Sequence, residues 1–293
     1  MEPLRRPSDS GRTAEAPTPV VRLGYIDYLN CLPVYFGIEQ GIVDLAVDVR
    51  KGRPTAMNRA FLAGELDVTP ISSIEYARYA DRCVIMPNLS ISADGRVASI
   101  LLFHKRPLSE LNGRPVALTA ASATSVVLTK IILREQYGVT PDYRVAQPDL
   151  TAMLQDHDAA LLIGDDALMA ALAHPEIPCA DMGSEWKALT GHLMVYALWV
   201  ARREFAERNP AAMRAVARLF NASQDYSWAH RPEMVAEAVR RRGLPNLVTE
   251  DYFDLIRHEF GPRYRRGLRT FLEHAQAIGE IAAVPDLHIW GEE

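Results

Sequence analysis

The sequence has little cysteine. Its 293 residues include three, Cys31, Cys83 and Cys179, which stand far apart and form no CxxC pair. An odd number of widely spaced cysteines argues against a disulfide framework and is typical of a reducing compartment. Histidines are scattered as well, with no HExxH motif and no Cys/His cluster at zinc-ligand spacing. We therefore expect no bound metal.

Long apolar runs and a strong excess of one charge are also lacking. The strongest apolar run, Met194–Ala201, is shorter than the roughly 18 residues of a transmembrane helix. Residues 1–20 contain no apolar export segment of roughly 7–15 residues. We expect them to form a disordered tail and the protein to be cytoplasmic. The net charge of −5 argues against nucleic acid or a membrane as the main partner.

Three common nucleotide-binding and hydrolase motifs are absent from the sequence. The sequence contains no GxGxxG, no P-loop and no GxSxG elbow. The sequence therefore gives no motif support for dinucleotide cofactors, P-loop nucleotides or a hydrolase triad.

From Val21 onwards, short β-rich runs alternate with helical stretches, which is typical of an α/β protein. The segments VASILLFHK and MVYALWVAR are unusually apolar, and we interpret them as strands that cross between two lobes. They predict a first lobe of residues 21–103 plus 199–293 and an inserted second lobe of residues 104–198. A cleft between hinged lobes is a common ligand site. The alternative is one continuous α/β sheet. Nothing in the pattern indicates the oligomeric state.

Small polar residues gather in four predicted strand-to-helix turns, namely Tyr28–Cys31, Thr69–Ser73, Thr119–Ser125 and Gly164–Asp166. Ligands of open α/β sheets bind beyond the carboxyl ends of strands, where helix N-termini offer free N–H groups. Together the turns predict a site for a carboxylate or phosphate. Any one turn alone is better explained by helix capping, worth about 0.5–2 kcal/mol. Ser72–Glu75, for example, fits the capping box S-x-x-E.

Several of these segments resemble the chorismate dehydratases of menaquinone biosynthesis, which act in the futalosine route. The resemblance begins with VRLGYIDYLNCLPVY and continues through GELDVTPISSIEY, DGRVAS, SATSVVL, YRVAQPDL and AALLIGDDAL. It spans roughly residues 21–203 and is weaker in the helical C-terminal third. It implies the two-lobed fold of type II periplasmic solute-binding proteins. It also implies a carbon–oxygen lyase that converts chorismate to 3-[(1-carboxyvinyl)oxy]benzoate and water without cofactor or metal.

The resemblance places an active-site asparagine on Asn30 and an active-site serine on Ser99. For a dianionic substrate we expect further contacts from the polar turns, at Ser72, Ser73, Ser122, Thr124, Ser125, Gly164 and Asp165. No acidic or histidine side chain in the turns is an evident base, so we hypothesise that the substrate's own side-chain carboxylate takes the proton. Two alternatives stay open. One is the sister enzyme 1,4-dihydroxy-6-naphthoate synthase, and the other is a protein that binds a small anion unchanged.

Overall fold

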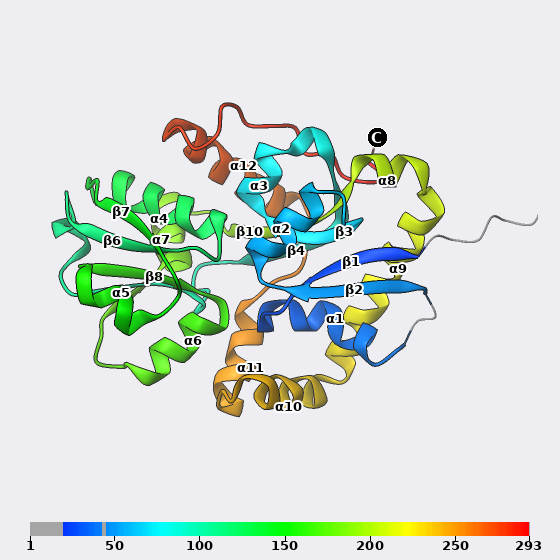
Figure 1. Cartoon of the computed structure of the whole chain (residues 1–293), viewed down its shortest axis with the longest axis horizontal. Helices are drawn as coiled ribbons and strands as arrows, with labels where there is room; N and C mark the ends of the chain where they lie inside the picture. The colour runs from blue at the N-terminus through cyan, green and yellow to red at the C-terminus, as the bar shows by residue number, and fades with distance from the viewer. Residues whose placement is uncertain (1–19, 43–44, 293) are drawn as a thin grey trace, which may run out of the picture.

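The computed structural model describes residues 20–42 and 45–292. These residues form two lobes, each built around a five-stranded sheet flanked by helices (Figure 1). The first sheet has the order β2-β1-β3-β10-β4, with β1 (Val21–Ile26), β2 (Val47–Gly52), β3 (Val68–Ser72), β4 (Cys83–Ala93) and β10 (Met194–Arg202). The second has the order β7-β6-β8-β5-β9, with β5 (Ile100–His104), β6 (Pro115–Thr119), β7 (Asp142–Ala146), β8 (Ala159–Ile163) and β9 (Cys179–Asp181).

One strand in each sheet is reversed. In the first sheet β10 is antiparallel to β3 and β4, whereas β1 is parallel to β2 and β3. In the second sheet β5 is antiparallel to β8 and β9, whereas β6 is parallel to β7 and β8. The chain enters the second sheet through β5 and returns to the first through β10. This arrangement is the two-lobed α/β fold predicted from the sequence.

The two apolar strands lie within single sheets. All of β5 belongs to the second sheet and all of β10 to the first, so the crossings fall before β5 and before β10. The predicted boundaries, after residue 103 and before residue 199, instead cut through these strands. Both strands are apolar because each is flanked by neighbours on both edges and buried between helical layers.

Helices cover both lobes. In the first lobe they are α1 (Leu32–Glu39), α2 (Pro54–Leu62), α3 (Ser73–Arg78), α8 (Arg203–Arg208), α9 (Pro210–Ala229), α10 (Arg231–Arg242), α11 (Asn246–Leu255) and α12 (Pro262–Ala277). In the second lobe they are α4 (Ala123–Glu135), α5 (Leu150–Asp156), α6 (Gly164–Ala173) and α7 (Met182–Thr190). Proline occupies the first turn of α1, α2, α9, α10 and α12, where its missing N–H costs no hydrogen bond.

The C-terminal third folds back onto the first lobe. Figure 1 shows α10 below α1, with α9 on the side away from the second lobe and α11 leading towards the junction of the lobes. α1 packs against α9 and α10, and α12 contacts β10 and α4. Within residues 20–42 and 45–292, no helix is long and apolar enough to cross a membrane. The expected N-terminal tail lies outside the described residues, apart from Val20.

Candidate functional site

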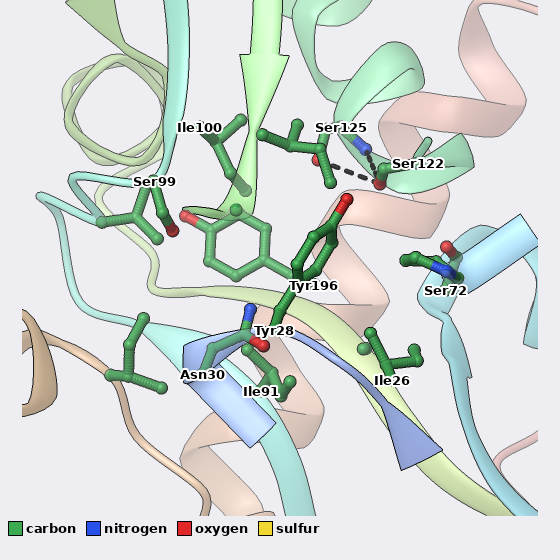
Figure 2. A pocket seen from close by; sticks show the side chains of 16 residues that line it. Ile26, Tyr28, Asn30, Ser72, Ile91, Ser99, Ile100, Ser122, Ser125 and Tyr196 are labelled. Atoms are coloured by element: carbon green, nitrogen blue, oxygen red, sulfur yellow. Dashed lines mark hydrogen bonds between the residues drawn. The ribbon is translucent and has the colours of Figure 1, made fainter. Parts of the chain in front are cut away.

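A small cavity of about 60 Å³ lies between the two lobes. It is lined by residues from both lobes: Ile26, Tyr28, Asn30, Pro54, Ser72, Ile91, Val97, Ser99, Ile100, Ser122, Ser125, Ile163, Gly164, Tyr196, Ala197 and Ile256. Isoleucine and valine side chains form an apolar wall, and a few polar groups converge within it (Figure 2).

Helix N-termini from both lobes meet at this cavity. Pro54 begins α2, Ser72 and Ser122 directly precede α3 and α4, and Gly164 begins α6. The last three follow the carboxyl ends of β3, β6 and β8, where the sequence placed its polar turns. The positive ends of helix dipoles favour a bound anion.

Three buried polar atoms in the cavity wall have no hydrogen-bond partner within the described part of the chain. They are the hydroxyls of Tyr28 and Tyr196 and Oδ1 of Asn30. Figure 2 shows both tyrosine rings projecting between Asn30, Ser99 and the serines of α4. Burial raises the pKa of Tyr28 to about 12 and that of Tyr196 well above its ordinary value, so both phenols keep their protons. The cavity therefore offers two uncommitted donors and one uncommitted acceptor.

Asn30 lies in a short 3₁₀ helix, Leu29–Cys31, that links β1 to α1. Nε2 of His258 donates to the Asn30 carbonyl at 2.8 Å. Burial lowers the pKa of His258 to about 4, a fall that the hydrogen bond to Asn30 opposes, so the ring is neutral at neutral pH. The backbone of Asn30 is thus held from behind while its amide faces the cavity.

Ser99 lies at the crossing into the second lobe. Its Oγ accepts a hydrogen bond from the buried Tyr252 hydroxyl at 3.0 Å, and its carbonyl accepts one from Gly164 N at 2.7 Å. Because Tyr252 supplies the donor, the Ser99 hydroxyl hydrogen is free to point at a ligand. The preceding residue, Ala98, has φ +59°, and its N–H donates to the Asp181 carboxylate at 2.6 Å. That carboxylate holds the left-handed conformation in place.

The serines at the starts of α3 and α4 behave differently. Ser122 caps α4, its Oγ accepting from Ser125 N at 3.3 Å, and the two hydroxyls lie 3.1 Å apart. Ser72 occupies the N-cap position of α3 but makes no side-chain capping bond. The capping box predicted at Ser72–Glu75 is therefore wrong: Glu75 pairs with Arg78, and Ser72 lines the cavity instead.

Three residues expected to contact substrate have structural partners and do not line the cavity. Ser73 Oγ donates to the Val195 carbonyl at 2.8 Å. Thr124 Oγ1 accepts from Ile74 N at 3.2 Å. Asp165 accepts from Leu29 N at 3.0 Å and from Arg242 Nε at 2.5 Å. The other six, Asn30, Ser72, Ser99, Ser122, Ser125 and Gly164, are brought together around the cavity.

Sequence reasoning missed the two tyrosines and the residues behind the site. Tyr28 lies inside one of the predicted polar turns but was not among the expected contacts. Tyr196 lies in the apolar run of β10 and gives no local signal. His258 and Tyr252 come from the C-terminal third, far in sequence from the turns they support.

No charged side chain from the described residues lines the cavity. Three cations, Lys51, Arg53 and Arg242, line an outer basin that shares Tyr28 with the cavity, together with three aspartates. These cations are paired with Glu39, Asp166 and Asp165 respectively. Within the described residues, no group of three or more His, Cys, Asp or Glu side chains is arranged to hold a metal ion. An anion in the cavity would be met by neutral donors and helix N-termini.

Comparison with known proteins identifies the family. Residues 21–277 match the family described as Menaquinone biosynthesis. The chain belongs to this family. A chorismate dehydratase from Thermus thermophilus is 35% identical over 241 residues, covering 77% of this chain and 84% of that protein. A 1,4-dihydroxy-6-naphtoate synthase from the same organism is 25% identical over 278 residues, covering 90% of this chain and 97% of that protein.

The fold of this chain is like that of the periplasmic binding proteins. The periplasmic aliphatic sulphonate binding protein SsuA from Escherichia coli superimposes with a TM-score of 0.67 at 18% sequence identity, covering 92% of each chain. At that identity the likeness concerns the fold alone. It agrees with the two lobes, each built around a mixed five-stranded sheet.

Proposed function

We propose that this member of the menaquinone biosynthesis family is a chorismate dehydratase, a carbon–oxygen lyase that converts chorismate to 3-[(1-carboxyvinyl)oxy]benzoate and water. The observation that carries the proposal is the set of unpaired hydrogen-bonding groups in the cavity. It holds uncommitted donors at Tyr28, Tyr196 and Ser99 and an uncommitted acceptor at Asn30. A ligand that matches them carries both anionic acceptors and a hydroxyl donor. Chorismate has two carboxylates and a hydroxyl on C4.

The uncharged wall supports this reaction in a second way. None of the described lining residues carries a carboxylate, imidazole, amine or thiol, so no lining side chain is an evident base. Chorismate brings its own base, because the side-chain carboxylate attached through C3 lies near the C3 proton. Nε2 of His258 donates to the Asn30 carbonyl, and His258 does not line the cavity.

The steps balance without a co-reactant. The side-chain carboxylate removes the C3 proton, and the released electron pair delocalises into the ring carboxylate as a dienolate. The C4–O bond then breaks, and the departing hydroxide takes up the transferred proton to leave as water. The ring becomes aromatic, which supplies the driving force. The protein positions the substrate and stabilises charge with preorganised donors.

In this proposal Asn30 and Ser99 act at the reacting centre. The Asn30 amide hydrogen-bonds the departing hydroxyl, because its acceptor and donor atoms face the cavity from the first lobe. The Ser99 hydroxyl donates from the opposite lobe. Ser72, Ser122 and Ser125, together with the N-terminus of α6, bind the carboxylates.

Incubation of the purified protein with chorismate tests the proposal. We expect a new aromatic absorption and a product 18 Da lighter than chorismate, formed over many turnovers. Binding of one chorismate per chain without product would favour an anion-binding protein. No effect on chorismate, with turnover of a larger substrate by ring formation, would favour the naphthoate synthase activity of the more distant relative.

A further inference from the structure

Asp165 bridges the two lobes in the outer basin that shares Tyr28 with the cavity. It lies in the first turn of α6 in the second lobe and is 5% exposed. Both of its bonds go to the first lobe: Leu29 N donates at 3.0 Å, and Arg242 Nε donates at 2.5 Å. Leu29 immediately precedes Asn30, and Arg242 ends α10.

The surroundings show that this contact is tightly built. Arg242 also donates to the Asp27 carbonyl at 2.6 Å, so it fixes the end of β1 and Asp165 together. Gly164, just before Asp165, has φ +60°, and a Cβ added there would lie 3.0 Å from the Tyr28 ring. The start of α6 therefore sits directly against the turn that carries Asn30, and only glycine allows the approach.

The two ends of that turn are held differently. The carbonyl of Asn30 is bonded by His258, which belongs to the same lobe. The N–H of Leu29 is bonded by Asp165, which belongs to the other lobe. Separation of the lobes would leave the His258 bond intact, return Asp165 to water and release Leu29.

We infer that Asp165 is a positioning residue that ties the Asn30 turn to the second lobe, so that the turn is fixed in its working geometry only when the cleft is closed. A buried carboxylate is stable only when it is paired and hydrogen-bonded. Arg242 and the Leu29 N–H provide that pairing in the closed form alone. Closure and placement of the Asn30 amide are thus one event. Only the kinetic consequence of this inference rests on the proposed function.

The direct test is amide hydrogen exchange at Leu29 in the full-length protein. We expect Leu29 to be protected in the wild type and to exchange at least about 10-fold faster in Asp165→Ala, which loses both bonds. Arg242→Met should give a smaller increase in the exchange rate of Leu29. The bond from Leu29 N–H to Asp165 survives in this variant, but the Asp165 carboxylate loses its ion pair with Arg242. The matched control is Asp166→Ala. Asp166 is the next residue and also pairs across the cleft, with Arg53 at 3.6 Å, but this partly exposed pair contributes little and Asp166 makes no bond to Leu29. It should leave Leu29 exchange unchanged.

The kinetic test uses chorismate turnover by the same variants. A loosened Asn30 turn should lower kcat by about 100-fold in Asp165→Ala, as expected when a positioning contact is lost, and Asp166→Ala should stay within about 2-fold of wild type. Unprotected Leu29 in the wild type would overturn the inference. So would an Asp165→Ala protein that melts lower but keeps wild-type exchange and kcat. A wild type that fails to convert chorismate, while Asp165→Ala still speeds exchange at Leu29, would contradict the proposed function and support the positioning role of Asp165.

Discussion

The starts of α3 and α4 look alike in sequence and differ in the folded protein. Both have a serine at the N-cap position facing the cavity. Ser122 is committed, since its Oγ caps Ser125 N. Ser72 makes no capping bond, because the N–H of Ile74 is instead bonded by Thr124, at 3.2 Å, from the other lobe. Thr124 of α4 therefore supplies the capping bond that Ser72 would otherwise make to the first turn of α3.

The polar groups near the cavity are thus of two kinds: some are hydrogen-bonded within the protein, and others are free to bind a ligand. Ser73, Thr124 and Asp165 have protein partners and lie outside the cavity wall. The Tyr28 and Tyr196 hydroxyls and Asn30 Oδ1 are buried in the wall without partners among the described residues. An unpaired buried polar atom costs roughly 1–3 kcal/mol, so free groups gathered in one cavity indicate where a ligand completes the hydrogen bonding.

The largest effect is expected at Asn30. Asn30→Ala should lower kcat by about 10²–10³-fold, the loss that follows removal of one preorganised donor. KM should change less, because the carboxylates still meet the serines. Asn30→Asp places a negative charge beside a dianion and should also impair turnover. Near-normal kcat in a well-folded Asn30→Ala protein would show that the unpaired amide has no part in the mechanism.

His258 is hydrogen-bonded to the Asn30 carbonyl and should make the stability of the protein fall at acid pH. Its pKa is lowered to about 4 in the folded protein, against about 6.5 in an unfolded chain. The unfolded state therefore binds the extra proton first, so stability is full above about pH 6.5 and falls as the pH drops towards 4. The full loss corresponds to about 3 kcal/mol. Melting temperatures across this range should show the fall, and His258→Gln should flatten it. An unchanged profile in the variant would show that other groups cause it.

The tyrosines should behave as free groups. Tyr28→Phe and Tyr196→Phe each remove a donor to a charged ligand, so KM should rise by about 10-fold or more. Stability should not fall, because no protein hydrogen bond is lost. Tyr35→Phe is the control: its hydroxyl donates to the Gly24 carbonyl at 2.6 Å and accepts from Trp199. It should lower the melting temperature and leave KM unchanged. Destabilisation in the cavity variants would mean that the hydroxyls have partners in solution.

Much of the fold could be predicted because it follows from local patterns. Alternating β and helical runs gave the α/β class, and the two most apolar strands marked the neighbourhood of the lobe crossings, although the boundaries themselves fell inside β5 and β10. The short strands β7 and β9 were not predicted, because their residues are exposed or half-buried and form no apolar face.

The site was predictable to the level of the turn but not of the side chain. Adjacent residues such as Ser72 and Ser73 have the same chemistry in sequence, yet one faces the cavity and the other bonds Val195. Which way each points depends on partners from distant strands. Asp165 shows the same limit, because its partners lie more than 70 residues away at Leu29 and Arg242.

The smallest and most discriminating effects are expected at the two helix starts. Ser122→Ala removes a cap and should lower the free energy of unfolding by about 0.5–2 kcal/mol. Ser72→Ala has no capping bond to lose, so its unfolding free energy should stay within about 0.5 kcal/mol of wild type. Its KM for chorismate should nevertheless rise by about 2–10-fold, the worth of one hydrogen bond.

Thr124→Val completes the comparison, because it keeps the shape of the side chain while removing the acceptor for Ile74 N–H. It should destabilise the protein like Ser122→Ala but leave KM close to wild type, since Thr124 does not line the cavity. Chemical denaturation and steady-state kinetics on the three variants give both quantities. Equal destabilisation by Ser72→Ala and Ser122→Ala would mean that both serines act as caps. The helix start of α3 would then have no hydroxyl to spare for a ligand.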